Sequence, residues 1–299
     1  MHILITGGTG FIGRALIKSL LTQDHKITVL SRDSEKVSGL FTESVTPLKD
    51  LQALATDDHF DVIINLAGAP IFDQRWTTER KQIIRDSRIR LTEQLIQAIA
   101  TMQQKPALLI SGSAIGYYGD QCDSELTEQS DSQPDFSQQL CADWEQAALT
   151  AEQYGVRVCL MRTGLVLGAN GGILQRMLLP FKLGLGGQLG SGQQWMSWIH
   201  LSDWIAIAET MINDKSMSGA YNATSIRPVI NQEFSKTLGK SLSRPACLPL
   251  PAFILKSLLG EMSELVLGSQ KVLPQRLTEQ GFEFQFSDLQ HALTDIVKS

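Results

Sequence analysis

The sequence lacks the features that mark several common classes of protein. Its four cysteines are scattered and form no C-x-x-C pair, so we expect no metal site and free thiols in a reducing cytoplasm. No apolar run is long enough to cross a bilayer. The 26 basic and 31 acidic side chains leave a net charge of -5, which argues against nucleic acid or an anionic membrane as the main partner. A cytoplasmic protein that binds a small molecule is the expectation that remains.

We expect no signal peptide, because residues 2–5 already read as a buried strand. Its 299 residues are enough for one large domain, or for a domain with an added lobe. Internal repeats, low-complexity tracts and charged tails are also missing from the sequence. We therefore expect an ordinary globular enzyme or binding protein.

The strongest motif is a glycine turn at residues 6–13, between a predicted strand and a predicted helix at residues 14–21. Its glycines permit a tight turn, a close approach of phosphate to the backbone, and close packing of the helix on the strand. Backbone N–H groups at the positive end of a helix bind a pyrophosphate. The turn predicts a dinucleotide site made of Gly7, Thr9, Gly10, Phe11, Ile12 and Gly13. The alternative is a plain strand–helix turn without a ligand.

Ser31 and Arg32 follow the second predicted strand, residues 26–30, where a dinucleotide fold meets the adenosine ribose. Enzymes that prefer NAD usually place an acid there to bind the 2′-hydroxyl. A hydroxyl and a guanidinium suit a 2′-phosphate, so we expect NADP(H) in preference to NAD(H). The alternative is that Arg32 is a solvated loop charge and that Asp33 binds the ribose.

Strands and helices alternate as far as residue 163, which predicts a doubly wound parallel sheet, the Rossmann arrangement. Further strands are expected at residues 45–48, 61–69, 107–113 and 156–161, and helices at 78–100 and 136–151. Leu66, Ala67 and Gly68 end the fourth strand, where small residues let a ligand lie against the backbone, although tight packing of strand on helix explains Ala67 and Gly68 equally well. Ser113 ends an apolar strand and is expected on the same ligand-binding edge.

Beyond residue 167 the pattern changes to a glycine-rich stretch, followed by short helices punctuated by proline. Seven glycines between residues 171 and 192 predict a loop over a ligand, although a flexible connection explains them as simply. Residues 195–200 predict one strand whose Trp195 and His200 line a substrate pocket, with a structural role as the alternative for His200, and Ser202 is expected to cap the next helix. The expected units are a dinucleotide-binding domain at 1–167, to which 198–225 return, and a smaller α-rich C-terminal substrate lobe at 168–197 and 226–299.

These landmarks resemble the extended short-chain dehydrogenase/reductase superfamily, and within it the uncharacterised epimerase-like subfamily related to nucleoside-diphosphate-sugar epimerases. The matching stretches are residues 6–13, 65–68, 87–88, 111–119, 144–145, 162–172, 179–192, 198–203 and 260–286. The resemblance implies a nicotinamide cofactor that also contacts Arg88, Arg162, Thr163 and Val166, and hydride transfer at a carbinol carbon. Members of the superfamily commonly pair through helices, so a homodimer is the implied oligomer.

The superfamily's catalytic serine is matched by Ser113, but its tyrosine–lysine pair has no counterpart. None of the four tyrosines has a lysine four residues later, and no lysine lies between Lys105 and Lys182. A tyrosine without that cation has a pKa of about 10 and is a poor base at neutral pH. Tyr117 or Tyr118 could move the proton if Arg88 supplied the missing positive charge. The alternative is that no such chemistry survives.

The sequence therefore predicts an NADP-dependent oxidoreductase or epimerase-like protein that acts on a small hydroxylated substrate, such as a nucleotide sugar. The intact glycine turn and Ser113 favour this interpretation. The alternative is a protein that binds NADP(H) without catalysis, in a structural or regulatory role.

Overall fold

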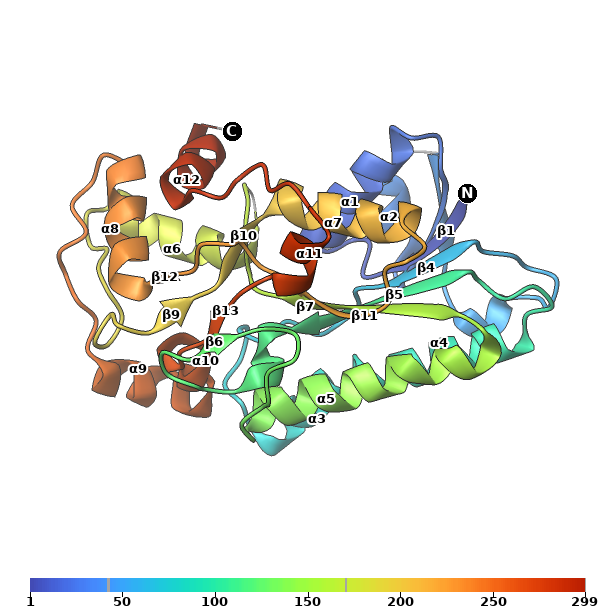
Figure 1. Ribbon diagram of the computed structural model, residues 1–299, viewed down its shortest axis with the longest axis horizontal. Helices are drawn as coiled ribbons and strands as arrows, with labels where there is room; N and C mark the ends of the chain where they lie inside the picture. Colours follow the sequence, from blue (N-terminus) through green and yellow to red (C-terminus); the bar gives the residue numbers. More distant parts are fainter. Residues whose placement is uncertain (42–43, 170, 299) are drawn as a thin grey trace.

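The computed structural model describes residues 1–41, 44–169 and 171–298, and a parallel sheet of seven strands forms its centre (Figure 1). Continuous apolar runs form these strands because both faces of the sheet are covered. In spatial order the strands are β11 (Gly219–Ala223), β7 (Arg157–Thr163), β5 (Leu108–Ala114), β4 (Val62–Asn65), β1 (His2–Thr6), β2 (Lys26–Leu30) and β3 (Val45–Leu48). The chain order reverses between β1 and β4, where doubly wound sheets open a ligand crevice. The predicted Rossmann arrangement is confirmed.

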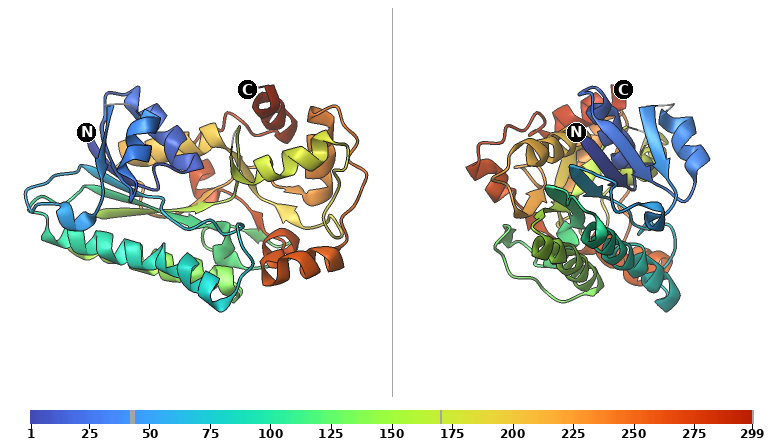
Figure 2. Two further views of the ribbon diagram at one scale, coloured as in Figure 1. Left: turned by 180° about the vertical axis from the view of Figure 1, so that it is seen from behind. Right: turned by 90° about the vertical axis from the view of Figure 1, so that its right-hand side faces the viewer.

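Helices form a layer on each face of the sheet (Figure 2). One layer holds α1 (Phe11–Leu21), α2 (Ser34–Phe41) and α7 (Leu201–Asn213), and the other holds α4 (Ile89–Thr101) and α5 (Phe136–Leu149), preceded by α3 (Thr78–Asp86). Ile17 and Ile207 lie fully buried in the first layer, as do Leu95 and Ala148 in the second. Short 3-10 helices complete this part at Leu51–Ala53, Ile115–Tyr118 and Thr150–Tyr154.

The lobe lies at one end of the long axis and has its own apolar core (Figure 1). Phe181, Trp198, Phe234 and Leu293 are among the side chains that fill this core. Its helices are α6 (Gly172–Lys182), α8 (Asn231–Ser241), α9 (Ala252–Leu259), α10 (Glu264–Leu267) and α12 (Leu289–Lys298), with a 3-10 turn at Gly260–Ser263. The smaller strands are β6 (Glu125–Leu126), β8 (Leu165–Leu167), β9 (Trp195–Met196), β10 (Trp198–His200), β12 (Val229–Ile230) and β13 (Lys271–Val272). No helix in the described parts of the chain is long and apolar enough to span a membrane.

The chain returns from the lobe to the main sheet twice. After β10, helix α7 packs against α1, and β11 then pairs with β7 as the edge strand. Further on, α11 (Gln275–Glu279) contacts β11 and places Leu277 in the core of the main sheet. Of the glycine-rich stretch, Asn170 lies outside the described residues.

The single helix predicted at residues 78–100 is two helices, α3 and α4, that meet at Ser87 and Arg88. The Ser87 hydroxyl and the Arg88 guanidinium both donate to the carbonyl of Ile84, at 2.9 and 3.1 Å. The Arg88 N–H therefore bonds one residue short, to the carbonyl of Arg85. Side chains that take a helical carbonyl interrupt the ladder in this way.

The single strand predicted at residues 195–200 is also divided in two. Strand β9 pairs with β12, whereas β10 pairs with β8, and Ser197 between them donates to the carbonyl of Gln270 at 2.7 Å. The expectation that Ser202 caps the following helix is wrong, because α7 begins at residue 201. Its cap is His200, whose Nδ1 accepts the N–H of Ser202 at 3.2 Å.

Candidate functional site

The glycine turn has no room for side chains. Gly7 adopts a φ of +70°, and a Cβ on it would lie 2.6 Å from the carbonyl carbon of Leu66 at the end of β4. A Cβ on Gly13 would lie 2.4 Å from the oxygen of Gly7. Gly10 is the N-cap of α1 and offers no capping side chain, so the first N–H groups of the helix face outward without a side-chain partner. This cradle fits a pyrophosphate.

The three residues expected near the adenosine ribose, Ser31, Arg32 and Asp33, differ in their contacts. Asp33 accepts the N–H of Lys36 at 2.9 Å and so caps the first turn of α2. The hydroxyl of Ser31 donates to the carbonyl of Asp33 at 3.0 Å. Arg32 between them is exposed. One oxygen of the Asp33 carboxylate therefore serves the helix, and the exposed guanidinium of Arg32 lies beside it.

Arg88 is placed against the backbone rather than beside a tyrosine. A Cβ on Gly68 would lie 2.7 Å from the guanidinium carbon of Arg88, whose Nη1 also donates to the carbonyl of Ala69 at 3.2 Å. The ring of Trp144 lies 5.4 Å away, and burial lowers the pKa of Arg88. Arg88 thus fixes the loop after β4, and among the described residues its contacts are with this loop, Ile84 and Trp144 and not with Tyr117 or Tyr118.

Register places three polar side chains in one row across the carboxyl ends of three strands. Ser113 on β5 lies opposite Arg162 on β7, and Arg162 lies opposite Asn222 on β11. Partners in a parallel register point to the same face of the sheet. All three are buried, so their polar groups need partners within the protein.

Glu145 and Tyr118 complete this row into a buried cluster of five residues. Arg162 donates from Nε and Nη2 to the two oxygens of Glu145, both at 2.9 Å, and Ser113 donates to the same carboxylate at 2.6 Å. The Tyr118 hydroxyl donates to Asn222 at 2.7 Å and accepts from Arg162 at 3.0 Å. Burial raises the pKa of Tyr118 to about 12, so it is the weaker candidate to move a proton.

Tyr117 lies on Arg162, whose guanidinium carbon is 3.4 Å from the centre of the ring. Helix α5 packs against the 3-10 helix that carries Tyr117, and the side chains it presents there are Ser137 and Cys141. A Cβ on Gly116 would lie 3.1 Å from Ser137 and 3.6 Å from the sulfur of Cys141. Burial raises the pKa of Cys141 to about 12, which makes it a neutral thiol. Positive charge therefore reaches Tyr117 from Arg162 on β7, not from the helix that carries the lysine in the superfamily.

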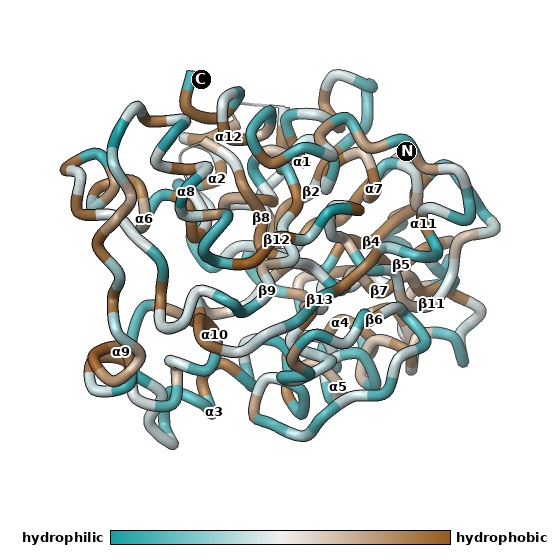
Figure 3. Tube along the Cα trace, turned by 60° about the vertical axis from the view of Figure 1, so that its left-hand side comes forward, coloured by the Kyte–Doolittle hydropathy of each residue, from teal (hydrophilic) through white to brown (hydrophobic). Residues whose placement is uncertain are grey.

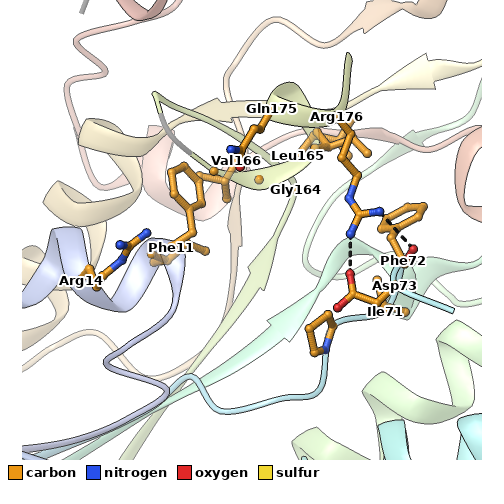
Figure 4. A pocket seen from close by; sticks show the side chains of 15 residues that line it. Phe11, Arg14, Ile71, Phe72, Asp73, Gly164, Leu165, Val166, Gln175 and Arg176 are labelled. Atoms are coloured by element: carbon orange, nitrogen blue, oxygen red, sulfur yellow. Dashed lines mark hydrogen bonds and ion pairs between the residues drawn. The ribbon is translucent and has the colours of Figure 1, made fainter. Parts of the chain in front are cut away.

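A cavity of about 740 Å³ lies between α1, the loop after β4, and the start of the lobe (Figure 4). Phe11, Ile12 and Val166 are the predicted site residues that line it. Across it, Arg176 of α6 forms an ion pair with Asp73 and donates to the carbonyl of Phe72 at 3.3 Å. This pair joins the lobe to the dinucleotide-binding part at the edge of the cavity.

The ring of Phe11 supports the glycine-rich stretch. A Cβ on Gly171 would lie 2.2 Å from this ring, and one on Gly168 would lie 2.9 Å from it. Of the seven glycines that were expected to form a loop over a ligand, Gly171 and Gly172 pack against the Phe11 ring of α1. Arg14, which also lines the cavity, was missed by the sequence analysis, although it directly follows the glycine turn.

The remaining predicted site residues lie apart from this cavity. Trp195 lines a second cavity of about 520 Å³ between α8 and the start of α12, and donates to Asp123 at 2.8 Å. His200 is buried, stacks on Phe286 at 3.8 Å and caps α7, so the structure gives it a structural position. Thr163 accepts the indole N–H of Trp204 at 3.1 Å.

Comparison with known proteins agrees with this geometry. The profile described as "NAD dependent epimerase/dehydratase family" matches residues 3–224, and that of a domain of unknown function, DUF1731, matches residues 250–296. The chain therefore belongs to the NAD-dependent epimerase/dehydratase family, whose members bind NAD(P), with a DUF1731 domain at its C-terminal end.

Individual relatives extend over the whole chain. The chloroplastic epimerase family protein SDR39U1 homolog of Arabidopsis thaliana is 40% identical over 309 aligned positions, covering 100% of this chain and 87% of its own. Epimerase family protein SA0724 of Staphylococcus aureus is 38% identical, covering 99% of this chain and 98% of its own. A crystal structure of human epimerase family protein SDR39U1 with NADPH matches with a TM-score of 0.91 and 32% identity over 100% of both chains.

Proposed function

We propose that the protein is an NADP(H)-dependent oxidoreductase or epimerase-like enzyme that acts on a small hydroxylated substrate, of which a nucleotide sugar is one example. The observation that carries the proposal is the cradle of Gly7, Gly10 and Gly13. Because no side chain covers this turn, a pyrophosphate can approach the backbone N–H groups at the start of α1. The similarity to a human protein solved with NADPH supports the same cofactor.

The preference for NADP(H) follows from Arg32. Asp33 uses one carboxylate oxygen to cap α2, and its other oxygen remains able to accept a hydrogen bond. Arg32 is exposed at the same place and can bind a 2′-phosphate through charge-assisted hydrogen bonds.

Bound nicotinamide supplies hydride transfer, and the protein supplies positions for the substrate oxygen and its proton. Ser113 gives its hydrogen to Glu145, so its oxygen is left to accept a hydrogen bond from a substrate hydroxyl. Tyr117 is the group that we assign to move the hydroxyl proton. The guanidinium of Arg162 lies against the ring of Tyr117 and brings a positive charge there. The cavity of about 740 Å³ is lined by the cofactor residues Phe11, Ile12 and Val166, so we assign it to the cofactor.

The cofactor assignment is tested by titrating the purified protein with NADPH and with NADH. Loss of a charge-assisted contact is worth about 1.5–3 kcal/mol, so Arg32→Ala should weaken NADPH by about 10-fold to 150-fold and leave NADH nearly unchanged. Asp33→Asn is the matched control, because the amide oxygen still caps α2. Equal weakening of both cofactors by Arg32→Ala contradicts the assignment, as does selective loss of NADH in Asp33→Asn.

A protein that binds NADP(H) without catalysis is the second candidate. The specific observation in its favour is that Ser137 and the neutral Cys141 occupy the face of α5 where the superfamily carries its tyrosine and lysine. A screen of hydroxy and carbonyl compounds for transfer of isotopically labelled hydride separates the two. Transfer that falls in Tyr117→Phe supports the enzyme, whereas tight NADPH binding with no transfer to any compound supports the second candidate.

A further inference from the structure

The far end of the lobe exposes a concentration of large apolar side chains. Among the described residues, nine large apolar side chains are exposed, and six of them belong to α6, to α9 or to the segments that follow and precede these helices. We call these six the outer face: Leu179, Leu183, Leu185, Leu248, Phe253 and Leu258. Phe253 is 72% exposed and Leu179 is 67% exposed, values that are unusual for side chains of this size.

Backbone contacts connect the two distant parts of the chain that carry the outer face. Arg244 donates to the carbonyl of Lys182 at 3.0 Å, and Leu248 donates its N–H to Gly186 at 3.2 Å. A bridge between Leu189 and Leu250 then leads directly into α9. Figures 1 and 2 place α6, α9 and these segments at the same end of the molecule, and Figure 3 brings that end forward, with α9 in hydrophobic colours.

The charge around the outer face is mostly positive, although Arg176 is paired with Asp73 and the exposed Glu261 lies just after α9. Residues 172–190 and 234–260 contain no aspartate or glutamate, but they carry six lysines and arginines. The remaining residues hold 20 basic and 31 acidic side chains, so the net charge of -5 hides a basic end on an acidic protein. The expectation that no membrane is a partner was based on the net charge of the whole chain. That value does not reveal a basic region within an acidic protein.

Exposed leucine and phenylalanine side chains among lysines and arginines match the interface of an anionic bilayer, which offers acyl chains to the former and phosphates to the latter. A second copy of this chain fits less well, because two outer faces would bring like charges together. We propose that the outer face docks the protein reversibly on an anionic lipid surface, with Phe253 and Leu258 inserted and Lys182 and Lys256 against the headgroups.

The test uses the full-length protein in flotation with vesicles of pure phosphatidylcholine and with vesicles of equal parts phosphatidylcholine and phosphatidylglycerol. We expect binding to the anionic vesicles to be at least about tenfold tighter and to weaken as salt is added. The double variant Lys182→Glu/Lys256→Glu should lose about fivefold for each cation, and Phe253→Ser/Leu258→Ser should lose more than about tenfold.

Matched controls come from exposed residues away from the outer face. Ile83→Ser removes an apolar side chain that is 51% exposed on α3, and Lys36→Glu reverses a charge on α2, so both should bind as the wild type does. Thermal unfolding and NADPH titration show that each variant is folded. Equal binding to both kinds of vesicle, or equal binding by all variants, overturns the proposal. A dimer that Phe253→Ser dissociates would assign the face to a second copy and overturn it too.

Discussion

Removal of the carboxylate of Glu145 should destabilise the protein far more than removal of an ordinary acidic side chain. Glu145 and Arg162 are only 7% and 6% exposed, and three hydrogen bonds between 2.6 and 2.9 Å converge on the carboxylate. Glu145→Ala leaves the guanidinium of Arg162 buried without its counter-charge and Ser113 without its acceptor. Loss of one partner of a buried pair costs about 3–5 kcal/mol.

Urea unfolding followed by tryptophan fluorescence measures this cost, since Trp144 adjoins Glu145 on α5. With a urea slope of about 3 kcal/mol per molar, the midpoint should fall by about 1–1.7 M. Asp143→Ala is the matched control on the same helix, because its pair with Arg85 is about one-third exposed and is worth at most about 1 kcal/mol. The double variant Glu145→Met/Arg162→Met should recover most of the loss, because no unpaired charge remains. A midpoint in Glu145→Ala no lower than that of Asp143→Ala would refute the reasoning.

Three further predictions concern the site and its thiols. Gly13→Ala would place a Cβ 2.4 Å from the oxygen of Gly7, so it should cost about 1–3 kcal/mol and weaken NADPH in a fluorescence titration; unchanged affinity would contradict the cradle. Tyr118→Phe removes a buried hydroxyl bonded at 2.7 and 3.0 Å and should lower stability by about 1–3 kcal/mol, whereas Tyr117→Phe should change stability by less than about 0.5 kcal/mol in the same urea assay. A thiol reagent at neutral pH should label the exposed Cys122 and Cys247 in the native protein and all four cysteines in denaturant. Cys141 and Cys159 should resist labelling in the native protein, because burial raises their pKa to about 12 and about 11 and so suppresses the reactive thiolate.

The sheet could be predicted because its signals are local. Most strands of the sheet are short apolar runs, and the glycine turn at residues 6–13 lies between a strand and a helix, as a dinucleotide site requires. The break between α3 and α4 could not be predicted from periodicity. The break depends on hydrogen bonds from the Ser87 and Arg88 side chains to the backbone carbonyl of Ile84. Such bonds do not change the spacing of apolar residues in the sequence.

The candidate site could be predicted only where one segment supplies the function. Ser113 ends its strand with a hydroxyl after an apolar run, and this abrupt change is visible in the sequence. The partners of Ser113 and Tyr118 come from a helix and from a distant strand, so Glu145 and Asn222 were missed. For the same reason the cation near Tyr117 was sought at Arg88 and is found at Arg162.

The position of β11 has a consequence for how the protein is made. This strand forms the edge of the main sheet, beside β7, yet it lies after the whole of α6 and α7 in the chain. During synthesis the outer side of β7 therefore has no partner until residue 223 has left the ribosome. The sheet that holds Arg162 is completed only after part of the lobe has been made, so the buried cluster forms late, and a nascent chain interrupted before β11 presents an open strand edge to its neighbours.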